Sequence, residues 1–142
     1  MISLNKIIDS ISIAINDNFG DDYEIYTESV EQGLREPCFS IISLNATNNL
    51  FRGNKYFRRN QFCIQYFPSK NDKKYECNEI LEELYDCLEL IKLIDSDKTI
   101  LGTKMNGEII DGVLNFFVNY DTYVYKVEVE KEFMEDLKIN NN

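Results

Sequence analysis

The central stretch of the chain reads Tyr56-Phe57-Arg58-Arg59-Asn60-Gln61-Phe62-Cys63-Ile64-Gln65-Tyr66-Phe67-Pro68, and apolar and polar side chains alternate along it. Successive side chains of a β-strand point to opposite faces, so the pattern predicts a strand with Phe62, Ile64 and Tyr66 on one face. The other face would carry Gln61, Cys63 and Gln65. Pro68 ends the strand because proline cannot donate a hydrogen bond to a ladder.

A helix is predicted directly behind this strand, over about residues 73–94. Apolar residues recur there at helical spacing, namely Cys77, Leu81, Leu84, Leu88 and Ile91. The acidic residues lie elsewhere on the helix, at Glu79, Glu82, Glu83, Asp86 and Glu89. Burial of each large apolar side chain contributes about 1.5–3 kcal/mol, so we expect this helix to anchor the fold.

A first helix is predicted over residues 3–19, with Ser3 as a cap and Gly20 as its end. Its apolar stripe is Leu4, Ile7, Ile8, Ile11 and Ile15. We interpret the stripe as a core-facing surface, although the pattern also fits an interface with another protein.

Further strands follow from alternation and turn signals. We expect strands at Tyr23–Thr27, at Cys38–Leu44, at Thr99–Ile110 with an interruption near Asn106-Gly107, and from Leu114 to Tyr120 with a continuation toward Val129. Asp111-Gly112 is a two-residue hairpin signal, and Glu130–Ile139 reads as a short terminal helix. The order α-β-β-β-α-β-β-(α) predicts an α+β fold: a mixed, mostly antiparallel five-stranded sheet with two main helices on one face.

The segment Asn45–Lys55 reads as a long polar loop between two strands, although a hairpin needs only a few residues to turn. Long loops in compact domains often carry function. Leu50-Phe51 would lie at its tip, where exposed apolar side chains are costly unless a partner covers them. The alternative is a loop whose aromatic residue folds back onto the domain.

The length of 142 residues fits a single domain over residues 1–139, followed by a disordered Asn-rich tail at residues 140–142. Alternation with Lys6 and Asp9 near the N-terminus does not fit a secretory signal or a membrane span. The sequence therefore predicts a protein that is made and kept in the cytoplasm.

Residues suited to catalysis or metal binding are few. The chain has no histidine, and its four cysteines (Cys38, Cys63, Cys77, Cys87) form no CxxC pair. Zinc binding is therefore not expected, and the cysteines are interpreted as buried thiols of a reducing compartment. The sequence also lacks a glycine-rich phosphate loop and a GxSxG turn, so we expect neither an enzyme nor a cofactor.

The net charge of −10 is unevenly distributed. Residues 51–75 hold seven basic residues against Asp72, a net charge of +6, which leaves −16 for the rest of the chain. Duplex DNA requires an extended positive surface, so specific nucleic-acid binding is not expected. A bipolar chain suits contact between copies, with the basic segment of one against an acidic surface of another.

The chain resembles a family of small phage tail terminator proteins from prophages and phage-tail-like bacteriocins. The resemblance spans about residues 30–125 and rests on the order of four motifs: Gln32-Gly33 with Pro37-Cys38-Phe39, the strand Tyr56–Pro68, Glu76-Cys77, and Asp111-Gly112-Val113-Leu114. The residues that match the pattern are Gly33, Pro37, Phe39, Arg58, Phe62, Ile64, Tyr66 and Pro68. Most of them read as scaffold, with a turn of positive φ at Gly33. Arg58 is the exception and is interpreted as an ion-pair partner, either between subunits or within the core.

The resemblance implies a structural protein of the virion. Such proteins form a ring, usually of six copies, that caps the head-proximal end of the tail tube and stops its growth, and in contractile tails they help to seat the sheath. The implied partners are further copies of the chain, the tube protein, the sheath and the head–tail connector. The residues predicted to make these contacts are Leu50, Phe51, Arg52, Lys55, Arg58 and Arg59.

Two other classes of function remain open from the residues alone. An acidic binding module of the nucleic-acid-mimic type would use the negative surface against a basic partner. A small enzyme would depend on Cys77 or Cys87 as its nucleophile.

Overall fold

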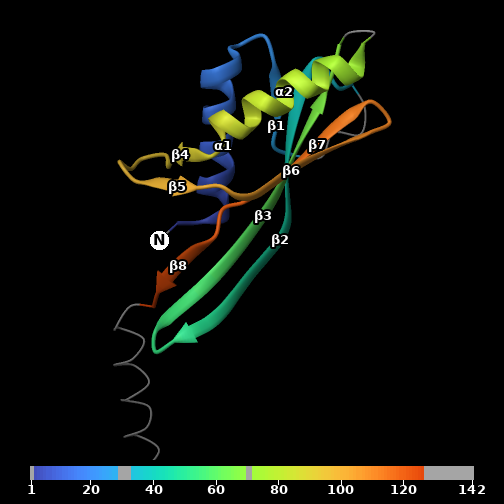
Figure 1. Cartoon of the computed structure of the whole chain (residues 1–142). Coiled ribbons are helices and arrows are strands. Elements are labelled where there is room, and N and C mark those ends of the chain that lie inside the picture. The colour runs from blue at the N-terminus through green and yellow to red at the C-terminus, as the bar shows by residue number, and fades with distance from the viewer. Residues whose placement is uncertain (1, 29–32, 70–71, 127–142) are drawn as a thin grey trace, which may run out of the picture.

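The computed structural model describes residues 2–28, 33–69 and 72–126, which Figure 1 shows as a ribbon. Along the chain the elements are α1 (Leu4–Phe19), β1 (Glu24–Tyr26), β2 (Cys38–Arg52), β3 (Lys55–Phe67), α2 (Lys73–Cys87), β4 (Leu90–Lys92), β5 (Thr99–Leu101), β6 (Thr103–Ile110), β7 (Val113–Asn119) and β8 (Thr122–Tyr125).

The main sheet has the order β1-β2-β3-β7-β6, and β8 adds to β3. β1 is parallel to β2, while the other pairs are antiparallel. β4 and β5 form a separate two-stranded sheet. The predicted α+β class and mixed, mostly antiparallel sheet are confirmed, with six strands in the main sheet where five were predicted.

The core lies between one face of the sheet and the two helices. From the sheet, it contains Phe39, Phe62, Ile64, Tyr66, Leu114, Phe116 and Val118. From α1 it contains Ile7, Ile11 and Ile15, which confirms that the stripe of this helix faces the core. Ser3 caps α1 by accepting a hydrogen bond from the Lys6 N–H, and Gly20 ends it with a φ of 86°.

α2 begins as predicted and ends earlier, at Cys87 where residue 94 was predicted. The chain leaves the helix because tertiary partners take up its next carbonyls. The Tyr120 hydroxyl donates to the Leu88 carbonyl over 2.6 Å, and the Gly102 N–H donates to the Glu89 carbonyl over 2.6 Å. Ile91, predicted on the helix, is instead buried in β4.

The loop predicted at Asn45–Lys55 is wrong, because these residues continue two strands. β2 and β3 pair from Cys38 with Phe67 to Arg52 with Lys55, and the turn is only Gly53-Asn54. A bulge between Ser43 and Asn45 lies where the strand leaves the core. Beyond it most side chains are polar and exposed, and the ladder to β3 holds the strand conformation. Figure 1 shows this hairpin running well past the helices.

The strands that follow residue 98 have other bounds than the predicted ones. The strand expected at Thr99–Ile110 is divided at Gly102, and its pairing with β7 shifts register between Thr103 and Asn106, close to the predicted interruption near Asn106-Gly107. The hairpin at Asp111-Gly112 is confirmed, and both residues have positive φ, at 51° and 77°. The following strand stops at Asn119 and resumes as β8 on the other part of β3. Residues 127–129 of its predicted continuation, the helix at Glu130–Ile139 and the tail at residues 140–142 lie outside the described residues.

Candidate functional site

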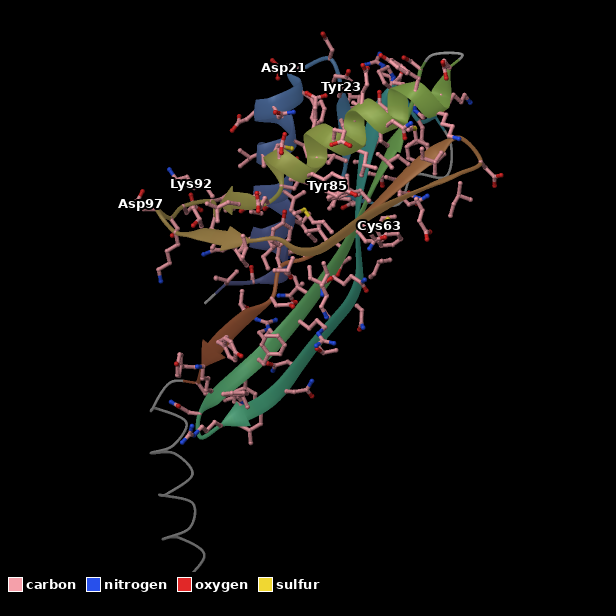
Figure 2. The ribbon with its side chains drawn as sticks, viewed as in Figure 1. Asp21, Tyr23, Cys63, Tyr85, Lys92 and Asp97 are labelled. Carbon is pink, nitrogen blue, oxygen red and sulfur yellow. The ribbon has the colours of Figure 1, made fainter. Side chains whose placement is uncertain are left out.

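The distal hairpin and β8 form a projection that we call the arm, defined as residues 45–60 with residues 122–125. We call the rest of the described chain the body. Phe57 and Arg58 of β3 pair with β2 on one side and with β8 on the other, so the arm has three strands. Figure 2 shows side chains along the arm, while its labelled residues Asp21, Tyr85 and Asp97 belong to the body. All six predicted contact residues lie on the arm.

The two apolar residues at the tip are the most exposed large hydrophobic side chains of the β2–β3 hairpin. Leu50 is 62% exposed and Phe51 is 56% exposed. A contiguous apolar surface on a projecting element marks an interaction site more often than an isolated exposed side chain does. The prediction that these residues lie at an exposed tip is therefore consistent with the structure, although they belong to a strand.

Aromatic rings gather around Lys55 on one face of the arm. Phe51 contacts Tyr123 edge-on with ring centroids 5.3 Å apart, and Phe57 lies 5.0 Å from Tyr123. The Lys55 ammonium lies 4.3 Å from the centroid of Tyr123, within the range of a cation–π interaction. These contacts hold the side chains in place before any partner arrives, which lowers the entropy that binding must overcome.

The basic residues of the arm have unequal roles. Arg58 is half-buried and donates from Nη1 to the Ile2 carbonyl over 3.2 Å, so it ties the arm to the start of α1. Arg59 is exposed and lies 6.0 Å from the ring of Phe57, and Arg52 is exposed at the tip. Within the described residues, none of these three or Lys55 forms a salt bridge. Arg58 therefore serves the fold, whereas Arg52 and Arg59 present charge to solvent.

Asn60 anchors the base of the arm and was missed by sequence reasoning. Its backbone N–H donates to Asp121 Oδ1 over 3.0 Å, and its carbonyl accepts from the Tyr120 N–H over 2.8 Å. Its side-chain amide donates to the Tyr120 carbonyl over 2.9 Å. These bonds turn the chain from β7 to β8, so a buried asparagine directs the third strand onto the arm. In the sequence, this role of Asn60 is indicated only by its being a polar residue on the strand face that carries Phe62 and Ile64.

Apart from Arg58, the residues that match the family pattern lie in the body. The Tyr66 hydroxyl donates to Glu76 Oε2 over 2.6 Å, and the Ser69 N–H donates to the same oxygen over 3.0 Å, so Glu76 holds the turn around Pro68. Burial, with the hydrogen bond to Glu76, raises the pKa of Tyr66. Gly33 has a φ of 78°, as predicted from its match to the pattern.

The cysteines are poor candidates for nucleophilic catalysis. Cys77 is buried, and burial raises the pKa of its thiol. Cys87 is partly buried, and burial followed by the nearby Glu83 raises its pKa to about 12. Catalysis needs the thiolate, and thiols with such pKa values stay protonated at neutral pH. The arrangement thus gives no support to an enzyme that uses Cys77 or Cys87.

The described residues carry no sign of a membrane span or a metal site. Neither helix in them is long and apolar enough to cross a membrane. Their histidine, cysteine and acidic side chains include no group of three or more that could hold a metal ion.

Comparison with known protein families identifies the family of this chain. A family model described as phage tail terminator protein matches residues 6–132. No curated protein matches the chain significantly. The family match covers the helices, the whole sheet and the arm, and it confirms the resemblance stated from the sequence. This chain therefore belongs to the phage tail terminator family and has a structural role in tail assembly.

Proposed function

We propose that the protein closes into a ring, most simply of six copies, on the head-proximal end of the tail tube and stops tube growth there. In a contractile tail the same ring would also seat the last sheath ring and face the head–tail connector. The observation that carries this proposal is the division of the molecule into a projecting basic arm and an acidic body.

The charge distribution favours contact between unlike surfaces. The arm carries Arg52, Lys55, Arg58 and Arg59, whereas the exposed face of α2 carries Glu79, Glu82, Glu83 and Asp86. A contact between two different surfaces of identical chains is heterologous, and it makes a closed ring whenever its rotation closes. Opposite charges on the two surfaces also disfavour contact between like surfaces.

Stopping growth requires two different faces on the ring. One face must bind the last ring of the tube, and the opposite face must not accept another tube subunit. The apolar tip at Leu50 and Phe51 lies far along the arm from the helices, so one end of the molecule can dock on the tube while the helical end stays turned away (Figure 1). Side chains that become buried at the centre of an interface usually supply most of the binding energy.

The ring itself is the first test. We expect purified protein to show closed rings by electron microscopy and a discrete oligomer by light scattering, either alone or after addition of tail tubes. In the second case the rings should sit at one end of each tube only. A chain that stays monomeric under both conditions, or that decorates tubes along their length, contradicts the proposal.

Charge reversal on the arm should weaken the ring without unfolding the chain. The variant Arg52→Glu with Arg59→Glu changes two exposed side chains, and we expect it to assemble at least tenfold more weakly at low salt, where screening is least. Arg58 is left intact because it bonds the Ile2 carbonyl. Light scattering across a salt series gives the measurement.

The matched control is Lys92→Glu with Lys104→Glu, which makes the same change in net charge at exposed positions of the body. If both double variants lose assembly equally, net charge and not the arm is responsible.

A further inference from the structure

The three-stranded arm has two open edges within the described part of the chain. β1 covers β2 only from Cys38 to Ser40, so β2 has β3 as its single partner over the rest of its length. β8 likewise pairs only with β3. Each open edge leaves backbone N–H and C=O groups without a strand partner.

The groups that point outward from β2 can be identified from Asn60. The N–H and carbonyl of Asn60 are bonded to Asp121 and Tyr120, on the side away from β2. Asn60 and Ala46 are therefore a pair without mutual hydrogen bonds, and the backbone groups of Ala46 point to the open edge. The register has no shift from Asn45 to Leu50, so Asn48 and Leu50 point outward as well.

This edge lacks the usual protection against strand pairing. Residues 45–51 contain no charged residue and no proline, and the register shifts lie at the two ends of the segment. Natural edge strands are normally blunted by lysine, proline, bulges or a covering segment. An edge without these features is a template for another strand.

The other edge of the arm faces a groove. A cavity of about 540 Å³ is lined by Tyr123, Val124 and Tyr125 of β8, by Ile2 and Lys6 near the start of α1, and by the turn at residues 93–98. Its lining includes apolar side chains and three residues of β8. A strand added along β8 would enter this groove.

We propose that the β2 edge of one copy pairs with the β8 edge of a second copy, an inference that rests on the ring proposed above. β2 and β8 are both antiparallel to β3, so they run in the same direction along the arm. When neighbouring arms are aligned, β8 of the second copy lies parallel to β2 of the first. It pairs with the same edge of β2 that β1 covers near its start. The contact joins two different edges, so it is heterologous and can close.

Charge also favours this pairing over contact between two β2 edges. Two β2 strands that meet side by side in the same direction bring identical basic tips together, with Arg52 of each copy in the same interface. Pairing of β2 with β8 instead places the Arg52 of only one copy at each contact.

Blocking the outward N–H of Asn48 tests the pairing. Asn48→Pro removes a donor that β3 does not use, and proline is tolerated at such edge positions. We expect a folded monomer whose ring assembly is weakened at least tenfold, whereas the control Asn48→Thr keeps the donor and assembles normally. Rings of Asn48→Pro that are as stable as those of the native chain overturn the proposal.

A cross-linking experiment tests the same contact without proline. Asn48 and Thr122 both pair with Arg58, so they lie level along the arm and on one face of the sheet. Cyclic symmetry keeps all copies at one height, which places Asn48 beside Thr122 of the next copy when the arms run along the ring axis. Adjacent strands are about 4.8 Å apart, within reach of a disulfide.

We expect a disulfide-linked dimer when Asn48→Cys and Thr122→Cys chains are mixed under oxidising conditions with tail tubes present, and none beyond the native background with either variant alone. Cross-linking of Asn48→Cys with itself indicates β2–β2 contact and overturns the proposal. Rings without the mixed dimer overturn the edge pairing and leave the proposed function standing. The absence of rings and of the mixed dimer contradicts both.

Discussion

We expect the double variant Leu50→Ser, Phe51→Ser to give tails of uncontrolled length while the protein stays folded. Both side chains are more than half exposed, so their removal uncovers no core. The losses within the monomer are an edge-on ring contact with Tyr123, worth about 0.5–1.5 kcal/mol, and a cation–π contact with Lys55, worth about 0.5–1 kcal/mol at an exposed site. In the ring, the same two side chains are proposed to hold the end of the tube, so their loss should abolish capping.

The measurement is the distribution of tail lengths in lysates of a producing strain, scored by electron microscopy beside a thermal melt of the purified variant. Ile110→Ser serves as the control, because Ile110 is 53% exposed at the β6–β7 hairpin of the body. Tails of normal length in the Leu50→Ser, Phe51→Ser variant would remove these residues from the capping surface. A lowered melting temperature beyond that of the control would instead assign them to the fold.

Gly102→Ala is expected to be the most destabilising small substitution in the body. A methyl group at Gly102 would lie 2.6 Å from the Leu88 carbonyl oxygen and 2.9 Å from a methyl of Val118. The carbonyl cannot move away without loss of its hydrogen bond from the Tyr120 hydroxyl. We expect a loss of about 3 kcal/mol in the free energy of unfolding, at the upper end for overpacking, and a fall in Tm of about 10 °C.

Gly107→Ala is the matched control, because the three atoms nearest to its new methyl all belong to the side chain of Leu81, the closest at 2.6 Å. Leu81 is half-buried and can change rotamer, so the expected loss is below about 1 kcal/mol. Chemical denaturation of both variants gives the comparison. Equal losses at the two glycines would show that the close approach of Gly102 to Leu88 does not control stability.

Local patterns were sufficient for the elements that bury one face. The isoleucines of α1 recur at helical spacing, and Phe62, Ile64 and Tyr66 alternate along β3, because each element must turn a single apolar surface to the core. The turn at Asp111-Gly112 was predictable because its two residues accept positive φ without a partner elsewhere in the chain.

The same reasoning failed where no face is buried. Asn45–Asn49 carries no alternation, so it read as a loop, yet the ladder to β3 makes it a strand. Exposure of Leu50 and Phe51 was correctly predicted from their place among polar residues, whereas the attachment of Arg58 to Ile2 was not, because the two are far apart in sequence.

The length of α2 and the position of β8 show most clearly what depends on tertiary contacts. The apolar periodicity continues through Leu88 and Ile91, so the sequence favours a longer helix. The helix ends because Tyr120 and Gly102 bond the carbonyls of Leu88 and Glu89. Asn60 similarly turns the chain at Tyr120 so that β8 joins the arm. Residue patterns therefore determined which segments form helices and strands around the core, while hydrogen bonds between distant segments decided where those elements end and built the arm.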